Sequence, residues 1–424
     1  MGKIDELIQQ YCPEGVEYVP IWSLTAWDKK FNGVEKSKQT KVIKYNYLLA
    51  ADLKSYQVEN GTVKLLTTNI SNLYTTEELS DGLASDGEVV AIPWGGNPIV
   101  QYYKGRFLTA DNRIATSLDT NILNNKFLYY CMLSQMKLIA SFYRGSGIKH
   151  PEMSKVLDLE IPLPPLPVQE AIVNILDRFA VYTAELQAEL QAELQARQQQ
   201  YNYYRDTLLS FEGRDDVQWK KLGELCPLIT KQTGFDYSNY IKDKLVREKK
   251  ENHIPYIQTK FFTGRQFDFN TDYYIPEETA ARFPKIVLDT KCILLSIVGA
   301  SIGNIGLYDN SQKSFLGGAI GVAKPSADVN TEFIYYYLTS HSGQKQIFHK
   351  VKGAGQATIT IEDIREFLVP QPSLSEQQRI VDILDRFDTL VNDLTQGLPA
   401  EIEARQQQYE YYRDQLLTFK RKEA

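Results

Sequence analysis

The sequence predicts an α+β protein with two mixed α/β domains, which are related by an internal repeat and separated by long coiled-coil-like helices. Three observations predict this fold class. A segment from the middle of the 424-residue chain returns near its end. Both copies of this segment carry apolar residues at helical spacing on a glutamine-rich background. The sequence before each copy mixes strand-like runs with turn signals.

The repeat relates residues 162–211 to residues 370–419 at a constant offset of 208, without a gap. We therefore expect four parts, at 1–158, 159–211, 212–367 and 368–424. The first and third parts have diverged, whereas the helical second and fourth parts have not. A duplicated chain can imitate a symmetric dimer, and dimeric DNA readers engage two half-sites about one helical turn apart. The repeat thus predicts two different readers on a constant scaffold.

The first helical segment, 169–211, is expected to form one helix of about 64 Å, at about 1.5 Å per residue. We expect the preceding prolines (PLPPLP, 162–167) to be non-helical. Apolar and aromatic residues at steps of three and four predict helix–helix or subunit contacts, although base stacking by the tyrosines is an alternative. The predicted scaffold residues are Ile172, Leu176, Phe179, Tyr201, Tyr204 and Leu208, with Ile380, Leu384, Phe387, Tyr409, Tyr412 and Leu416 in the second copy.

The tetrapeptide AELQ occurs three times in succession over residues 184–195. One such unit adds about 6 Å of helix and a rotation of about 40° beyond a full turn. B-DNA turns by roughly 35° per base pair. We therefore hypothesise that the number of units sets the spacing between the two DNA half-sites. A slippage-prone repeat without consequence is the alternative.

The second helical segment departs from the first at Gly397 and Pro399. Glycine ends helices, and proline is tolerated in a first turn. We therefore expect two helices with a kink, or a helix hairpin, in this segment.

Each diverged domain contains a predicted buried strand, at 88–93 (EVVAIP) and 292–298 (CILLSIV), that runs into a glycine loop, at 94–97 and 299–304. Such a loop makes a tight turn or lets the backbone approach phosphate closely. Basic, glycine-bearing loops follow near the end of each domain, at 143–150 and 350–356. We expect DNA contacts from side chains that suit base edges or phosphates, although the lysine runs are also compatible with solvated surface. These residues are Lys36, Lys38, Lys41, Lys44, Trp94, Asn97, Lys104, Arg106, Asn112, Arg113, Arg144, Ser146, Lys149, Lys242, Lys244, Arg247, Ser301, Asn304, Lys350, Lys352 and Gln356.

The net charge of −6 argues at first against a nucleic-acid binder. However, the helical parts carry the acidity, with 3 basic against 7 acidic residues in 159–211 and 7 against 10 in 368–424. The diverged domains are close to neutral and can still bind DNA through one basic face. The sequence shows no membrane span and no secretory signal, so we expect a cytoplasmic protein.

No catalytic or metal-binding motif is present. The four cysteines, Cys12, Cys131, Cys226 and Cys292, form no C-x-x-C pair and are expected to be reduced and mostly buried. The four histidines show neither metal spacing nor a nucleophile–base arrangement. The phosphate loop of ATPases and the N-P-P-[YF] motif of adenine methyltransferases are both absent. We therefore expect no catalysis, no metal and no cofactor bound by this chain.

Two repeated motifs carry a family resemblance. The sequence Q-x-x-I-V-x-I-L-D-R-F, followed by Q-Q-Q-Y-x-Y-Y-R-D-x-L-L-x-F, occurs in both helical parts, at 169–211 and 377–419. With the loops at 88–96 and 296–304, the chain resembles the specificity subunits of type I restriction–modification enzymes. The AELQ repeat resembles a feature of some members.

This resemblance implies a bacterial phage-defence complex that recognises a bipartite DNA site with a non-specific spacer. Two modification subunits would methylate adenines with S-adenosylmethionine, and two restriction subunits would use ATP and Mg²⁺ to translocate and cleave unmethylated DNA. Loops of this chain would help to present a flipped adenine to the methylase. The alternative is a stand-alone, pseudo-dimeric DNA-binding regulator.

Overall fold

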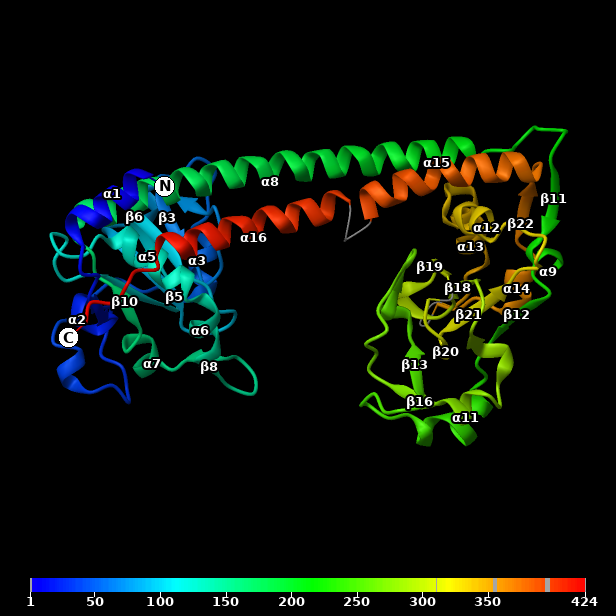
Figure 1. Cartoon of the computed structure of the whole chain (residues 1–424), viewed down its shortest axis with the longest axis horizontal. Helices are drawn as coiled ribbons and strands as arrows, with labels where there is room; N and C mark the ends of the chain where they lie inside the picture. Colours follow the sequence, from blue (N-terminus) through cyan, green and yellow to red (C-terminus); the bar gives the residue numbers. More distant parts are fainter. Residues whose placement is uncertain (1, 310, 354–356, 393–396, 424) are drawn as a thin grey trace. The chain divides into compact units, whose positions relative to one another are not determined.

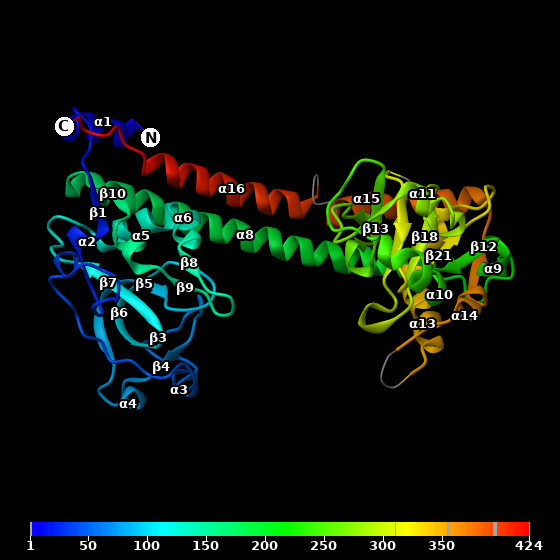
Figure 2. The same ribbon diagram turned by 90° about the horizontal axis from the view of Figure 1, so that it is seen from below.

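The computed structural model describes residues 2–309, 311–353, 357–392 and 397–423 (Figure 1). The chain divides into two compact units. The first unit contains residues up to Glu189 and residues from Ile402 onward, so both ends of the described chain belong to it (Figure 2). The second unit is Leu190–Glu401. Each unit therefore combines one mixed α/β domain with parts of both helical segments.

The first unit is built on a six-stranded sheet with the strand order β2-β7-β5-β6-β3-β4. Its strands are antiparallel except for the parallel pair β3–β6. The predicted strand at 88–93 is confirmed, because it lies within β5 (Ser85–Pro93). The strands and the packed helices are β2 Thr25–Trp27, β3 Val63–Leu66, β4 Tyr74–Thr75, β6 Gln101–Thr109, β7 Asn112–Ser117, α5 Asn125–Ser134, α6 Met136–Ser141 and α7 Met153–Leu157. Shorter elements are α1 Gly2–Tyr11, α2 Ile21–Leu24, η1 Lys36–Lys38, α3 Ala50–Ser55, α4 Glu77–Ser80, β8 Tyr143–Arg144 and β9 His150–Pro151.

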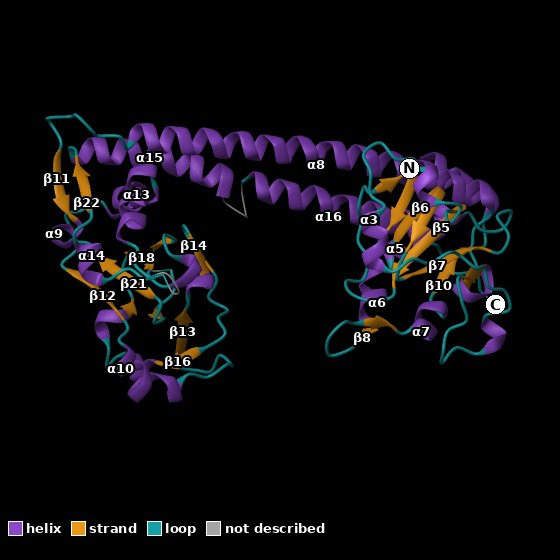
Figure 3. Ribbon diagram, turned by 180° about the vertical axis from the view of Figure 1, so that it is seen from behind, coloured by secondary structure: helices purple, strands orange, loops and turns teal. Residues whose placement is uncertain are grey.

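The second unit contains two four-stranded sheets, β12-β21-β18-β19 and β16-β13-β20-β17, with helices around them (Figure 3). The predicted strand at 292–298 is confirmed over β18 (Cys292–Ser296), which is buried throughout. The other strands and the main helices are β12 Leu228–Lys231, β13 His253–Ile257, β16 Tyr274–Pro276, β17 Val287–Leu288, β19 Ile305–Tyr308, β20 Ser314–Leu316, β21 Ile320–Lys324, α12 Thr331–Thr339 and α13 His341–Lys350. Shorter elements include α9 Leu222–Leu225, α10 Gly234–Asp236, η2 Tyr237–Ile241, η3 Lys242–Lys244, β14 Phe262–Thr263, β15 Gln266–Phe267, α11 Glu277–Ala280, η6 Gly299–Ser301 and α14 Ile361–Arg365.

Each unit contains its own small antiparallel ribbon, which connects the start of the domain to its end. In the first unit, β1 (Tyr18–Pro20) pairs with β10 (Glu160–Pro162). In the second, β11 (Gln218–Lys221) pairs with β22 (Leu368–Gln371). A helix of the repeated segment follows shortly after β10 and after β22. The ribbon therefore places the helical segment against its own domain in the same way in both copies.

The first helical segment is one helix of 43 residues, α8 (Leu166–Leu208), as predicted. It begins earlier than expected, so the expectation that all of 162–167 is non-helical is wrong for Leu166 and Pro167. Proline is tolerated there because the N–H groups of a first turn have no partner within the helix. The second segment forms two helices, α15 (Leu374–Asn392) and α16 (Leu398–Leu416), with Pro399 in the first turn of α16, which confirms the prediction of a divided helix.

The predicted scaffold residues fall into two groups. The first group is buried against the domain of its own unit, so these residues build the scaffold rather than a surface for other subunits: Ile172, Leu176, Tyr201, Ile380 and Leu384. The second group is half-buried or exposed on the helices: Phe179, Tyr204, Leu208, Phe387, Tyr409, Tyr412 and Leu416. The four cysteines are buried and free, as expected.

Candidate nucleic-acid interface

Two loops predicted to contact DNA lie side by side in the first unit. The glycine loop after β5 meets the loop between β8 and β9, about fifty residues later in the chain. The Gly96 amide donates a hydrogen bond of 3.1 Å to the Lys149 carbonyl. Nδ1 of His150 lies 2.7 Å from the Trp94 carbonyl oxygen, and the two rings are 5.2 Å apart. The structure therefore unites two separately predicted loops into one surface.

The glycines of the first loop are needed for this contact between loops. A Cβ atom at Gly95 would lie 2.9 Å from Cγ2 of Ile148, which is too close for real atoms. Gly96 has a φ of 100°, a conformation that favours glycine. Ile148 itself is 69% exposed. Sequence reasoning missed this exposed apolar side chain, because its contact with Gly95 arises only in the folded domain.

The united surface exposes cations and hydrogen-bonding groups. Asn97, Arg144, Ser146 and Lys149 are all exposed. No described residue forms an ion pair with Arg144 or Lys149, so their charges are available to phosphate. Trp94 is half-buried and does not present a free ring face, since the Arg113 guanidinium lies 4.1 Å from its centroid.

The expected DNA contacts of Asn112 and Arg113 need correction, because both side chains are buried. The Asn112 amide donates to the Leu66 carbonyl at 2.8 Å. The Arg113 guanidinium donates to the Asn112 carbonyl at 2.8 Å and lies 3.9 Å from Asp28. Burial raises the pKa of Asp28, against the opposing charge of Arg113. Both residues therefore hold the sheet together, and their side chains are closed off from a base edge.

The same association of loops occurs in the second unit. The Gly299 amide, after β18, donates to the Ala357 carbonyl at 2.9 Å. Gln344 of α13 donates its side-chain amide to the Gly303 carbonyl at 3.0 Å. A Cβ atom at Gly303 would lie 2.8 Å from Cζ of Phe348, which is 56% exposed. Both units thus present an exposed apolar side chain seated on a loop glycine.

The predicted residues of this second surface differ in availability. Ser301 and Lys350 are half-buried, and Lys352 is exposed with its ammonium 3.1 Å from Asp363. The Asn304 amide donates to the Phe262 carbonyl at 3.0 Å, so it is engaged within the domain. Gln356 lies outside the described residues.

The predicted basic patches also differ in availability. Lys38 pairs with Asp158 at 2.7 Å, Lys104 with Glu88 at 3.2 Å, and Arg106 with Glu77 at 3.0 Å. These three charges are therefore partly neutralised. The others are exposed and have no ion-pair partner among the described residues: Lys36, Lys41, Lys44, Lys242, Lys244 and Arg247.

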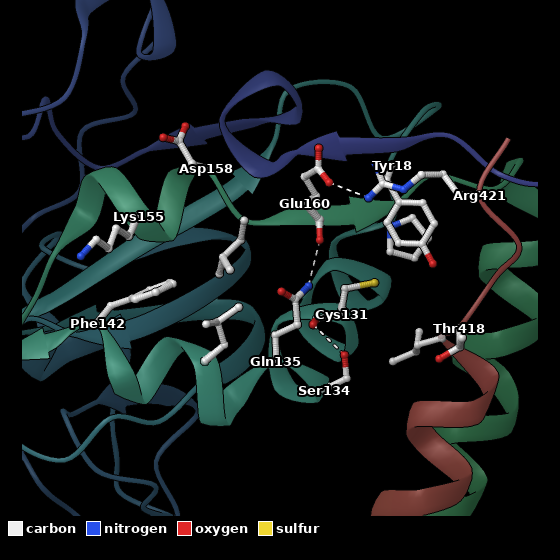
Figure 4. Close-up of a pocket in the computed structure, with 14 residues that line it drawn as sticks. Tyr18, Cys131, Ser134, Gln135, Phe142, Lys155, Asp158, Glu160, Thr418 and Arg421 are labelled. Carbon is white, nitrogen blue, oxygen red and sulfur yellow. Dashed lines mark hydrogen bonds and ion pairs between the residues drawn. The ribbon is translucent and has the colours of Figure 1, made fainter. Parts of the chain in front are cut away.

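A groove of about 720 Å³ separates α5 and α6 from the C-terminal segment in the first unit (Figure 4). Arg421 crosses its rim to Glu160 at 2.6 Å and lies 4.5 Å from the Tyr18 ring centroid. The thiol of Cys131 lies at the groove, and burial raises its pKa, which disfavours a reactive thiolate. The polar groups of this groove therefore attach the C-terminal segment to the first domain.

The described residues were compared with the requirements of a metal site and of a membrane span. Among residues 2–309, 311–353, 357–392 and 397–423, no group of three or more His, Cys, Asp or Glu side chains is placed to hold a metal ion. None of the helices in this part of the chain combines the length and the hydrophobicity that a membrane-spanning segment requires.

Comparisons with known proteins identify the family. The model of the type I restriction modification DNA specificity domain matches twice, at residues 29–196 and 214–404. The type I restriction enzyme EcoR124I/EcoR124II specificity subunit of Escherichia coli is 36% identical over 73% of this chain and 75% of its own length. A putative type I specificity subunit of Haemophilus influenzae, S.HindORF215P, is 30% identical over 81% of this chain and 86% of its own.

A solved structure supports the fold. A chain from a structural study of complex assembly and conformational transition of the type I R-M system aligns with a TM-score of 0.59 over 96% of this chain and 98% of its own, at 16% identity. The chain therefore belongs to the family of type I restriction–modification DNA specificity subunits. Such subunits are non-catalytic and function within restriction–modification complexes, in which catalysis lies in partner subunits.

Proposed function

We propose that the chain recognises a bipartite DNA site, with one half-site for each unit and a non-specific spacer between them. The observation that carries this proposal is the repeated association of a glycine loop with a later loop of the same domain. The Gly96–Lys149 bond makes this contact in one unit and the Gly299–Ala357 bond in the other. Cationic side chains stand beside both contacts. Because the two domains have diverged, the half-sites differ, and the complete site is not a palindrome.

The helical scaffold offers a surface for partner subunits in each unit. In the first unit, Phe179 and Tyr412 are in ring contact at 6.3 Å, and Tyr182 and Tyr411 beside them are 66% and 60% exposed. We name this set the first aromatic patch. Large exposed aromatic groups on a folded surface mark interaction sites. The first patch is therefore a docking surface rather than part of the core.

The second unit repeats this patch at the offset of 208 residues. Tyr204 stacks on Phe387 at 5.4 Å, and Tyr203 and Leu390 are 67% and 38% exposed. We name this set the second aromatic patch. Two patches of the same chemistry suit two copies of the same partner. We assign them to two modification subunits, each placed beside one DNA-reading domain.

We further propose the remaining parts of the complex from the family to which the chain belongs. The modification subunits carry S-adenosylmethionine and methylate an adenine in each half-site. Two restriction subunits, with ATP and Mg²⁺, translocate and cleave unmethylated DNA. This chain binds none of these cofactors itself. We place the complex in the bacterial cytoplasm, where it meets host and phage DNA.

The experiment that tests this function is a methylome. Adenine methylation is mapped by long-read sequencing in a host that carries only this chain and its modification subunit, and in the same host without this chain. The proposal predicts a bipartite motif with a gap of fixed length that is lost without the chain. Unchanged methylation, together with a DNA footprint from the purified chain, would instead identify a stand-alone regulator.

A further inference from the structure

A second cavity, of about 650 Å³, lies in the second unit, where β12 and β13 end. Lys231 and Gln232 form its wall at the end of β12, and Gln258 follows β13. Short helical turns, including Lys242, close another side. A cavity of several hundred Å³ suits a small organic molecule. None of the contacts described above between the glycine loops and the later loops involves this cavity.

The charged side chains that line this cavity are all cationic. They are Lys231 and Lys242, and no carboxylate is among the lining residues. Both lysines are exposed, and neither has an ion-pair partner among the described residues. Two ammonium groups without a counter-ion favour an anionic ligand, and phosphate is an anion that lysine binds well.

Three tyrosines and two glutamines make up much of the remaining wall, together with Thr233, Leu245 and two glycines. Tyr237, Tyr256 and Tyr273 contribute rings. The buried Tyr256 hydroxyl donates to Oε1 of Gln232 at 2.9 Å, and burial raises the pKa of Tyr256 to about 12, so this hydroxyl stays protonated. Gln232 in turn donates to the Leu316 carbonyl at 3.3 Å, which fixes this part of the wall.

Other polar groups of the wall remain available to a ligand. No described residue forms a hydrogen bond with the Gln258 amide or the Tyr273 hydroxyl. Amides pair with base edges, and tyrosine rings stack on bases. A base bearing a phosphate matches both the amide–aromatic wall and the two lysines.

From these features we infer that the cavity bounded by Lys231, Lys242, Gln258 and Tyr273 is a binding site for one nucleotide. This inference rests on the proposed DNA-reading function. We propose that the nucleotide comes from the target DNA. A nucleotide that leaves the base stack can enter this cavity. Its base would then stack on a tyrosine ring, and its phosphate would pair with a lysine. Unstacking a nucleotide costs free energy, and this cost is lowest where the base is already unpaired.

The test uses the full chain and the DNA target defined by the methylome. Each base pair of the half-site read by residues 212–367 is replaced in turn by a mismatch, and the binding affinity is measured. Capture of an unstacked nucleotide predicts that one mismatch tightens binding about tenfold, because the pair no longer has to be opened. Lys242→Ala and Gln258→Ala should each abolish this gain. Lys220→Ala is the matched control, since Lys220 is exposed on β11 and does not line the cavity.

A second arm separates target DNA from free nucleotide. Binding of dAMP, dTMP, dCMP and dGMP to the full chain is measured by saturation-transfer NMR, with inorganic phosphate as competitor. Suppose that mononucleotides bind, that Gln258→Ala removes this binding, and that no mismatch tightens duplex binding. This result would support the same site with a free nucleotide as its ligand.

Three results would overturn the inference. The first is that neither mismatches nor mononucleotides give a signal. The second is that both signals survive in the two cavity variants. The third is that phosphate alone competes as well as a nucleotide, which would indicate a simple anion site. If the methylome shows no bipartite motif that depends on this chain, the proposed function fails instead, and the two failures are distinguishable.

Discussion

The Tyr130 hydroxyl donates a hydrogen bond of 2.7 Å to Oδ1 of Asp177, and this bond joins the first domain to its helix α8. Asp177 also forms an ion pair with Lys126, with 2.8 Å between Oδ2 and Nζ. In the second unit, Tyr336 donates to Asp385 at 2.6 Å, and Asp385 lies 208 residues after Asp177. The repeated Leu-Asp-Arg-Phe sequence thus uses the same acid to hold two diverged domains.

The cation of this contact has changed between the copies. Lys126 belongs to α5 in the first unit, whereas Arg265, between β14 and β15, pairs with Asp385 at 2.6 Å in the second. The acid and the tyrosine are therefore constant, and each domain supplies its own positive charge. The two domains can therefore differ in sequence and still make the same contact with the helical segments.

Replacing Tyr130 with phenylalanine should lower the free energy of unfolding by about 1.5–3 kcal/mol, the usual value of a hydrogen bond to a charged group. Tyr336→Phe should have a similar effect, because it removes the equivalent bond. Chemical denaturation, followed by circular dichroism, measures both. Tyr203→Phe is the control, since Tyr203 is 67% exposed. Equal stability of all three variants would show that these bonds do not hold the domains.

Lys149→Ala should weaken DNA binding without lowering the melting temperature, because Lys149 is exposed and unpaired among the described residues. The slope of log affinity against log salt should fall by about 1, as one phosphate contact is lost. Fluorescence anisotropy at several salt concentrations measures this slope. Asn112→Ala should instead lower stability, because it removes the buried hydrogen bond from the Asn112 side-chain amide to the Leu66 carbonyl. A stable Asn112→Ala protein with reduced affinity would restore Asn112 as a DNA contact.

Tyr411→Ser should weaken the docking of one modification subunit, and Tyr203→Ser should weaken the docking of the other. Loss of a large aromatic side chain at the centre of an interface costs on the order of 2 kcal/mol, or about thirtyfold in affinity. Native mass spectrometry of the assembled complex should then show one modification subunit instead of two. Tyr11→Ser is the control, since Tyr11 is exposed but lies in neither patch. Full assembly with both tyrosines replaced would exclude the aromatic patches as docking surfaces.

Deleting one AELQ unit, residues 184–187, should shorten the non-specific spacer of the target by about one base pair. The deleted residues lie within α8, so the helix loses about 6 Å and keeps its continuity. Both half-sites should remain unchanged, because neither candidate DNA-contact surface includes these residues. The methylome of the deletion strain gives the new spacer directly. An unaltered spacer would leave the repeat without consequence for DNA spacing.

The repeat and its helices could be predicted because both leave local signals. The offset of 208 needs only sequence identity, and α8 follows from residues at steps of three and four. The position of Gly397 and Pro399 likewise marks the division between α15 and α16. The candidate site depends on tertiary structure and was less predictable.

Two examples show why the site was harder to predict. The sequence predicts that Asn112 faces DNA, but it begins β7, and its buried side-chain amide donates to the Leu66 carbonyl at 2.8 Å. Polar residues at strand ends give no sequence signal for the direction in which they point. The cavity beside Gln258 unites residues from five separate parts of the second domain, and only the fold brings them together.

The most direct test of the account is an exchange of one reader. Residues 12–158 are replaced by the equivalent domain of a relative with a different methylation motif, and adenine methylation is mapped again. The account predicts that one half of the bipartite motif changes to that of the relative, while the other half stays as it was. Loss of specificity in both halves, despite full assembly with the modification subunits, would contradict the claim that each domain reads one half-site independently.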